Sequence, residues 1–156
     1  MWKPSSPPPP STRPEQEQQQ QQQPDPAPGR PRQESIRQPV AGRRVAQIVK
    51  LKPEFVAKYK AVHAAVWPEV LQQIKMCNIR DYSIFHDPGT GILFASFKYV
   101  GFDYAGDVER MRENAKVREW WAMTDGFQES LVPGAENSES GDPAWWQEVE
   151  EVFYTP

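Results

Sequence analysis

The first forty residues contain too few apolar side chains to form a folded domain, and this limits where the fold can lie. They hold 11 of the 17 prolines, four of them consecutive at residues 7–10, and a run of six glutamines at residues 18–23. Burial of so little apolar surface cannot offset the entropy lost when a chain becomes ordered. We therefore expect residues 1–40 to be a disordered Pro/Gln-rich tail and residues 41–156 to form one small domain.

The charge of the expected domain argues against polyanionic partners. Residues 41–156 carry 13 basic and 17 acidic side chains, whereas the tail carries five and four. An acidic domain without a basic cluster is a poor match for nucleic acid or for an anionic membrane surface. No apolar run approaches the roughly 18 residues that a membrane span requires. We therefore expect no nucleic acid and no membrane among the partners.

The amino terminus and the single cysteine both favour a cytoplasmic location. Prolines replace the apolar stretch of a secretory signal, and they would break the amphipathic helix of a mitochondrial presequence. Cys77 has no second cysteine with which to form an internal disulfide, which fits a reducing compartment. We expect Cys77 to be a small buried apolar side chain.

Hydrophobic periodicity predicts four strands and two long helical regions in the domain. Strands are expected at residues 43–51, 79–86, 92–99 and 147–155, because apolar residues alternate there between turn signals. A helical region is expected from Pro53 to about Asn78, interrupted at Pro68. A second helix is expected over residues 103–122, with these residues inward: Tyr104, Val108, Met111, Ala115 and Trp120 or Trp121. Residues 126–144 are expected to form a long loop.

The order strand, helix, strand, strand, helix, strand is that of the ferredoxin-like βαββαβ fold. This α+β fold has an antiparallel sheet with its helices on one face. The other face needs a cover, and the third strand is apolar on both faces, with Phe94 on one and Leu93 and Phe97 on the other. A second copy of the domain in a two-fold dimer would supply that cover, so we expect a homodimer.

The segment from Tyr59 to Glu69 carries the strongest functional signal in the chain. Tyr59, His63 and Trp67 recur every four residues, so they share a helix face just before the break at Pro68. An imidazole titrates near neutral pH and can both donate and accept a proton. Flat rings beside it suit an uncharged ligand whose hydroxyl protons must move, such as a sugar. A core histidine without a chemical role is the alternative.

Further aromatic residues are candidates for ligand contact. Tyr82 shares a strand face with Ile84, and it could equally be a core tyrosine with its hydroxyl at the edge. Trp120 and Trp121 point about 100° apart on a helix, so one can pack while the other lines a cavity. For the pair at residues 145–146, core packing, dimer contact and ligand contact are all open.

Neither a metal nor a cofactor is expected. His63, His86 and Glu69 are residue types that ligate metals, but no two of them show a recognisable metal-binding spacing. The chain also lacks a glycine-rich phosphate loop, a serine-centred nucleophile elbow and a paired-cysteine motif.

Taken in order, these residues resemble the L-rhamnose mutarotase family over about residues 43–156. The resemblance rests on these motifs: Tyr59-x-x-x-His63-x-x-x-Trp67-Pro68-Glu69, the Tyr-x-Ile-aromatic stretch at Tyr82, Trp120-Trp121 followed by Met123-Thr124-Asp125, and the closing residues 150–156. Two departures concern the second half of the domain. The stretch between Trp121 and Met123 is one residue shorter than expected, and the loop from Gly126 to Ala144 is longer and more acidic.

The resemblance implies a dimeric α+β barrel of ferredoxin-like subunits that acts as an isomerase. It would interconvert the α and β anomers of L-rhamnose by acid/base ring opening and closure. The proton donor would be His63, and the sugar-binding residues would be Tyr59, Tyr82, Trp120 and Trp121. One alternative is a mutarotase or binder for another 6-deoxy sugar or small molecule on the same fold. Another is an interaction protein whose proline stretch docks on SH3- or WW-type grooves.

Overall fold

A computed structural model describes residues 42–155 of the chain, and the predicted tail at residues 1–40 lies outside the described residues. The elements are, in order, β1 (Arg43–Leu51), η1 (Pro53–Phe55), α1 (Val56–His63), α2 (Pro68–Met76), β2 (Ile79–Asp87), β3 (Ile92–Tyr99), α3 (Tyr104–Glu113), α4 (Ala115–Asp125), β4 (Gln128–Glu129) and β5 (Gln147–Val149). None of the helices between residues 42 and 155 is long and apolar enough to span a bilayer.

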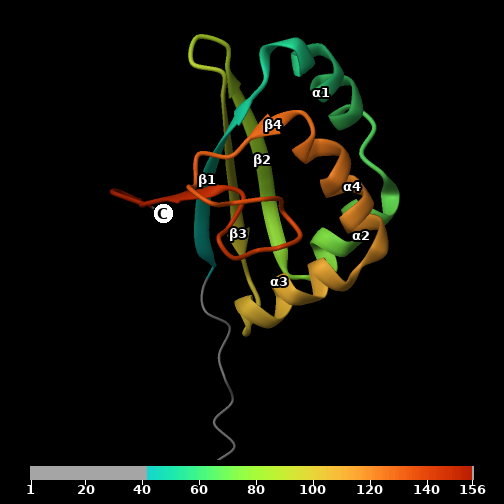
Figure 1. Ribbon diagram of the computed structural model, residues 1–156. Coiled ribbons are helices and arrows are strands. Elements are labelled where there is room, and N and C mark those ends of the chain that lie inside the picture. Colours follow the sequence, from blue (N-terminus) through green and yellow to red (C-terminus); the bar gives the residue numbers. More distant parts are fainter. Residues whose placement is uncertain (1–41, 156) are drawn as a thin grey trace, which may run out of the picture. The chain divides into compact units, whose positions relative to one another are not determined.

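The strands form one antiparallel sheet in the order β2-β3-β1-β4, with β5 also paired to β1. The helices lie together on one face of this sheet (Figure 1). The predicted α+β class and βαββαβ order are therefore confirmed. Two short strands share the place of the fourth strand: β4 pairs with Lys50 and Leu51, and β5 pairs with β1 from Ala46 to Ile48.

The core lies between the sheet and the helices and contains two clusters of buried residues. One cluster is built around Val49, Leu51, Tyr59, Leu93 and Phe127. The other is built around Val45, Ile79 and Phe97. Every second residue of a strand faces the same side, so the inward row of β1 runs from Val45 through Gln47 to Val49. Gln47 therefore interrupts an apolar row between the two clusters.

The first helical region is interrupted where the sequence predicts. Residues 64–67 separate α1 from α2, and Pro68 occupies the first turn of α2, where its missing N–H leaves no hydrogen bond unmade. The preceding residue, Trp67, has the extended backbone (ψ 135°) that a following proline favours.

The single helix predicted over residues 103–122 is wrong, because two helices meet there. Asn114 is extended (ψ 116°) and caps α4, its side-chain oxygen accepting from the N–H groups of Lys116 and Val117 at 2.9 and 3.2 Å. The new helix start also changes the inward face: Ala115 is exposed, and Val117 is fully buried instead. Asparagine favours a helix N-cap over a helix interior, which accounts for the break.

The last predicted strand is shorter than expected, and the predicted loop contains a strand. Pairing with β1 ends at Val149, and residues 150–155 are exposed without regular structure. They stay next to β1 through side chains, since Arg44 Nε lies 2.9 Å from a Glu151 carboxylate oxygen. The strand β4 lies inside the predicted loop of residues 126–144, paired to the end of β1.

Candidate active site

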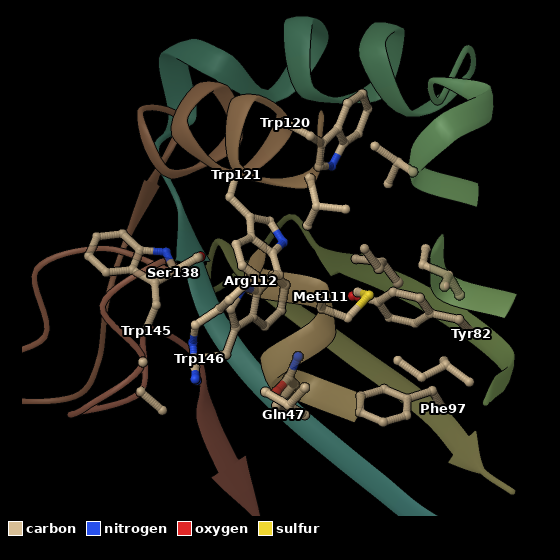
Figure 2. Close-up of a pocket in the computed structure, with 18 of the residues that line it drawn as sticks. Gln47, Tyr82, Phe97, Met111, Arg112, Trp120, Trp121, Ser138, Trp145 and Trp146 are labelled. Atoms are coloured by element: carbon tan, nitrogen blue, oxygen red, sulfur yellow. The ribbon is translucent and has the colours of Figure 1, made fainter. Parts of the chain in front are cut away.

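A pocket of about 880 Å³ lies between the inner face of the sheet and the helices. Figure 2 shows its lining side chains converging from both sides. A row across the sheet forms part of its floor, because Glu148 pairs with Gln47, Gln47 with Ala95, and Ala95 with Ile84. Gln47, Ile84 and Glu148 of this row line the pocket, whereas Ala95 is fully buried. The pocket therefore occupies the gap between the two core clusters.

His63 is the last residue of α1, and its side chain lines the pocket. Its Nδ1 lies 2.9 Å from the Tyr59 carbonyl oxygen. A carbonyl only accepts hydrogen bonds, so Nδ1 carries the proton and the neutral ring keeps Nε2 free as a base. Burial lowers the pKa of His63, and the hydrogen bond to Tyr59 opposes this only in part. His63 is therefore mainly neutral at pH 7.

Tyr59 supports His63 from behind and is not among the residues that line the pocket. It is 5% exposed, and its ring stacks on the imidazole with centroids 4.0 Å apart. Burial is the main reason that the pKa of Tyr59 is raised; the neighbouring Tyr82 adds to it, and the Gln128 side chain opposes it. The structure thus brings Tyr59 to His63, and a direct contact between Tyr59 and a ligand stays a prediction.

Tyr82 reaches the pocket because of a bulge in β2. Arg80 pairs with Lys98 and Ser83 with Ser96, so β2 has one residue more than β3 between these pairs. Asp81 takes up the extra residue with φ of 52°. The bulge reverses the alternation, and Tyr82 consequently faces the helices together with Ile84. Without the bulge, Tyr82 would face the opposite side of the sheet.

Tyr82 is a neutral phenol that borders the pocket. It packs edge-on against Phe97, with ring centroids 5.4 Å apart. Tyr82 is 39% exposed and faces the pocket. Desolvation by the surrounding side chains, with a smaller contribution from Tyr104, raises its pKa to about 12. The hydroxyl therefore keeps its proton at neutral pH.

Trp120 and Trp121 both line the pocket from α4, at different depths. Trp120 is 6% exposed and packs edge-on against both His63 and Trp67, at centroid distances of 5.2 and 5.3 Å. Trp121 is half-buried, and its indole points toward the middle of the pocket (Figure 2). The predicted division into a packing and a cavity-facing indole is therefore only partly right, because Trp120 does both.

Among the lining residues that the sequence did not single out are Gln47 and Arg112, and the sequence left the role of Trp146 open. Gln47 had a usable signal, because it is a polar residue in the inward row that contains Val45 and Val49. Arg112 had none, since its position depends on how α3 packs against the loop of residues 130–146. Trp146 points into the pocket, whereas the ring of Trp145 points away from its centre (Figure 2).

The loop of residues 130–146 forms one wall of the pocket and is held by polar contacts. Ser130 Oγ donates to the Trp145 carbonyl at 2.6 Å, and Trp145 Nε1 donates to Gln128 Oε1 at 3.0 Å. The Asp125 carboxylate at the end of α4 accepts from the backbone N–H and the hydroxyl of Ser138, at 2.8 and 2.6 Å. The wall is therefore fixed to α4 and β4 before any ligand arrives.

Arg112 also supports this wall. Gly141 has φ of +67°, and a Cβ there would collide with the Arg112 guanidinium, so the helix and the loop meet closely. Nη1 of Arg112 pairs with Glu109 at 2.6 Å, while its buried Nε has no hydrogen-bond partner. Arg112 thus lies under the loop.

The remaining sequence candidates lie apart from the pocket lining. His86 is half-buried at the end of β2, and Glu69 is exposed in the first turn of α2. Within residues 42–155, no three histidine, cysteine, aspartate or glutamate side chains gather into a group that could hold a metal ion.

Comparisons with known proteins agree on one family. The model of the L-rhamnose mutarotase family matches residues 44–155. The L-rhamnose mutarotase of Phocaeicola vulgatus is 41% identical over 71 residues, which are 46% of this chain and 65% of that relative. The L-rhamnose mutarotase of Listeria monocytogenes is 31% identical over 111 residues, which are 71% of this chain and 96% of that relative.

A solved structure extends the similarity to the fold. The crystal structure of L-rhamnose mutarotase from Formosa agariphila superposes with a TM-score of 0.57 and 30% identity. The match covers 73% of this chain and 99% of that chain. Residues 44–155, which match the family model, include every residue that lines the pocket.

Proposed function

The chain belongs to the L-rhamnose mutarotase family, and we propose that it interconverts the α and β anomers of L-rhamnose. The observation that carries this proposal is His63, a mainly neutral imidazole with Nε2 free, at the edge of a pocket lined with aromatic rings. Such a group can take and return a hydroxyl proton at neutral pH. An aromatic pocket suits the C–H faces of a neutral pyranose.

Ring opening needs one proton removed from the anomeric hydroxyl and one delivered to the ring oxygen. In the proposed mechanism, His63 Nε2 takes the proton from the anomeric oxygen while the Tyr82 hydroxyl gives its proton to the ring oxygen. The bond between C1 and the ring oxygen then breaks to give the open aldehyde. General acid–base assistance of this kind typically contributes a factor of about 10² to 10⁴.

Ring closure reverses both proton transfers after rotation about the C1–C2 bond. The former ring oxygen attacks the other face of the aldehyde and returns its proton to Tyr82. The aldehyde oxygen becomes the new anomeric hydroxyl by taking the proton from His63. Both side chains end in their starting states, so the cycle balances. The assignment of the second proton to Tyr82 rather than Tyr59 rests on their positions, since Tyr82 borders the pocket and Tyr59 lies behind His63.

In this proposal the two adjacent tryptophans of α4 bind the sugar, and Tyr59 orients the catalytic imidazole. Trp120 and Trp121 stack on the C–H surface of the ring and exclude water from the reacting atoms. Tyr59 is a positioning residue, because its ring and carbonyl hold the imidazole. This role differs from the direct sugar contact that the sequence predicts for Tyr59, and it rests on the absence of Tyr59 from the pocket lining.

A homodimer in the cytoplasm is part of the proposal. The face of the sheet away from the helices carries two exposed aromatic rings, Phe85 (60%) and Phe94 (39%). A second sheet of the same kind would cover them, as expected for a dimeric barrel. Cys77 is buried and free, which is compatible with a reducing compartment.

Exchange between the two anomers can be measured by magnetisation-transfer NMR on L-rhamnose with and without the full chain. We expect acceleration by the protein, and its loss in His63→Asn with an unchanged thermal unfolding curve. His86→Asn is the matched control, because His86 lies outside the pocket lining, and it should keep the full rate. If L-fucose but not L-rhamnose exchanges faster, the sugar has been assigned wrongly.

A further inference from the structure

We propose that the pocket accepts a second, neutral sugar ring joined to the reducing rhamnose. The first ring would lie at His63, and the second at the end formed by Gln47, Trp146 and Glu148. This inference deepens the proposed function and rests on it, because the anomeric carbon must lie at His63. The linkage would use a hydroxyl remote from that carbon, since the anomeric hydroxyl has to stay free for ring opening.

The size of the pocket is the first reason. Its volume of about 880 Å³ lies near the upper end of the roughly 300–1,000 Å³ found for sites that hold drug-sized ligands. A single deoxyhexose is far smaller than such ligands. L-rhamnose alone would therefore leave part of the pocket to water.

The two ends of the pocket belong to different parts of the fold. Trp120, which contacts His63, and Gln47 lie at opposite ends of the view in Figure 2. On β1, Gln47 is two residues from Val49, so about 7 Å of strand separate these two residues. Val49 packs in the same cluster as Tyr59, next to the His63 end of the pocket. The second site is thus a continuation of the first one along the sheet.

The chemistry of the far end fits a sugar better than an apolar group. The indole of Trp146 points into the pocket and offers a flat face to C–H bonds (Figure 2). Gln47 presents an amide donor and acceptor in the middle of an apolar row. An apolar ligand would leave this amide without a partner, whereas sugar hydroxyls can both donate to it and accept from it.

The charges at the far end favour a neutral ring over an acidic one. Glu148 pairs with Arg43 at 3.1 Å, and Arg112 pairs with Glu109 at 2.6 Å. Both cations therefore already have a carboxylate partner. A uronic acid would bring a further negative charge next to Glu148, at a distance where like charges repel.

Anomer exchange on two sugars tests the inference. The full chain is given L-rhamnose and, separately, a rhamnosyl-rhamnose disaccharide linked through O4 with a free reducing end, and kcat/KM is obtained by NMR. We expect the disaccharide to be exchanged at least as efficiently as L-rhamnose. Trp146→Ala should lower kcat/KM for the disaccharide by about ten- to a hundredfold and leave that for L-rhamnose within about twofold.

Two further variants separate ligand contact from loop damage. Gln47→Leu changes the floor without touching the loop, and it should also reduce exchange of the disaccharide selectively. Leu131→Ala alters the same loop at an exposed residue outside the pocket lining, so both sugars should be exchanged at the unchanged rate. Thermal unfolding of each variant shows that it is folded.

The outcomes distinguish this inference from the proposed function. If neither sugar is exchanged faster than in buffer, the proposed function is wrong, and the inference with it. If L-rhamnose is exchanged and the disaccharide is not, only the second site is overturned. Equal losses for both sugars in Trp146→Ala and in Gln47→Leu would also overturn it, because those residues would then serve the first ring.

Discussion

His63 and Tyr59 hold each other through two contacts, a ring stack with centroids 4.0 Å apart and a 2.9 Å hydrogen bond from the imidazole Nδ1 to the Tyr59 carbonyl. Only the first contact depends on the Tyr59 side chain. The backbone carbonyl survives any substitution, so it continues to define which nitrogen is free. The aromatic ring sets the tilt and the burial of the imidazole.

Tyr59→Phe should therefore retain anomer exchange within about threefold, because the ring remains. Tyr59→Ala should reduce kcat by more than about tenfold, since the imidazole loses its support. The same change should move the pKa of His63 back toward its ordinary value as the ring gains solvent. The pH profile of kcat for the two variants measures both effects. A large loss in Tyr59→Phe would mean that the hydroxyl takes part in the chemistry.

The pH dependence follows from the direction of the His63 shift. Its pKa is lowered by burial, so the active neutral form persists to acidic pH, and the rate should fall only below the ordinary value of about 6.5. Tyr82, with a pKa of about 12, should keep the alkaline side flat through pH 9. Exchange measured by NMR from pH 4 to 9 checks this. A midpoint above the ordinary histidine value would contradict it.

The same shift links protonation to stability. Because the unfolded chain binds a proton at His63 more readily than the folded chain, the free energy of unfolding should fall as pH drops below about 6.5. It should stop falling at the folded-state pKa. Urea unfolding of the wild type and of His63→Asn from pH 5 to 8 compares the two curves. If the free energy of unfolding falls equally with pH in both proteins, His63 does not contribute to the pH dependence of stability.

The bulge at Asp81 can be tested through its positive φ of 52°. Asp81→Gly should be neutral or stabilising by up to about 1 kcal/mol, because glycine adopts this conformation without strain. Asp81→Val should destabilise by about 1–3 kcal/mol and lower exchange activity, since a β-branched residue opposes the bulge that orients Tyr82. Urea unfolding and NMR exchange measure the two effects. Equal stability of the two variants would show that the bulge tolerates any residue.

The predictable parts of the fold are those governed by near neighbours in the sequence. The strand at residues 43–51 and the hairpin around Gly89 and Gly91 follow from alternation and turn residues, and the break at Pro68 follows from proline itself. The break at Asn114 was missed because the apolar spacing continues across it. The bulge at Asp81 had a signal in the sequence, because the apolar residues Ile79 and Ile84 are an odd number of residues apart in one strand. In the structure both face the same side of the sheet.

The site divides in the same way. Helical spacing alone brings His63 onto Tyr59, and adjacency puts Trp120 and Trp121 on one helix. The position of Gln47 in the pocket floor could not be predicted from local spacing, because it depends on the register of Gln47 with Ala95 across the sheet. Long-range pairing of this kind is not encoded in any single segment. The lengths of the last strands also depend on where β1 offers free hydrogen-bonding groups.

Tyr99 anchors a buried polar network away from the pocket lining. Its hydroxyl donates to Asp107 at 2.7 Å and accepts from the backbone N–H of Asp103 at 2.9 Å, while Asn78 also donates to Asp107 at 2.8 Å. Tyr99→Phe removes two of these bonds and should cost about 2–4 kcal/mol of unfolding free energy, with exchange activity retained. Tyr154→Phe, at an exposed tyrosine, is the control and should change little. A small effect at Tyr99 would mean that water replaces the hydroxyl.

The proposed dimer places the outer face of the sheet against its counterpart, and Phe94 lies in the middle of that face. Its cross-strand neighbours are Ile48 on β1 and Phe85 on β2, whose ring centroid is 6.3 Å from that of Phe94. Because a two-fold interface buries each residue twice, Phe94→Glu should weaken dimerisation by at least about a hundredfold. Sedimentation equilibrium at micromolar concentration should show a dimer for the wild type and a monomer for the variant. Phe102→Glu, at a residue that is 54% exposed in the connection between β3 and α3, should remain dimeric. A wild type that sediments as a monomer would leave this apolar face to a different partner.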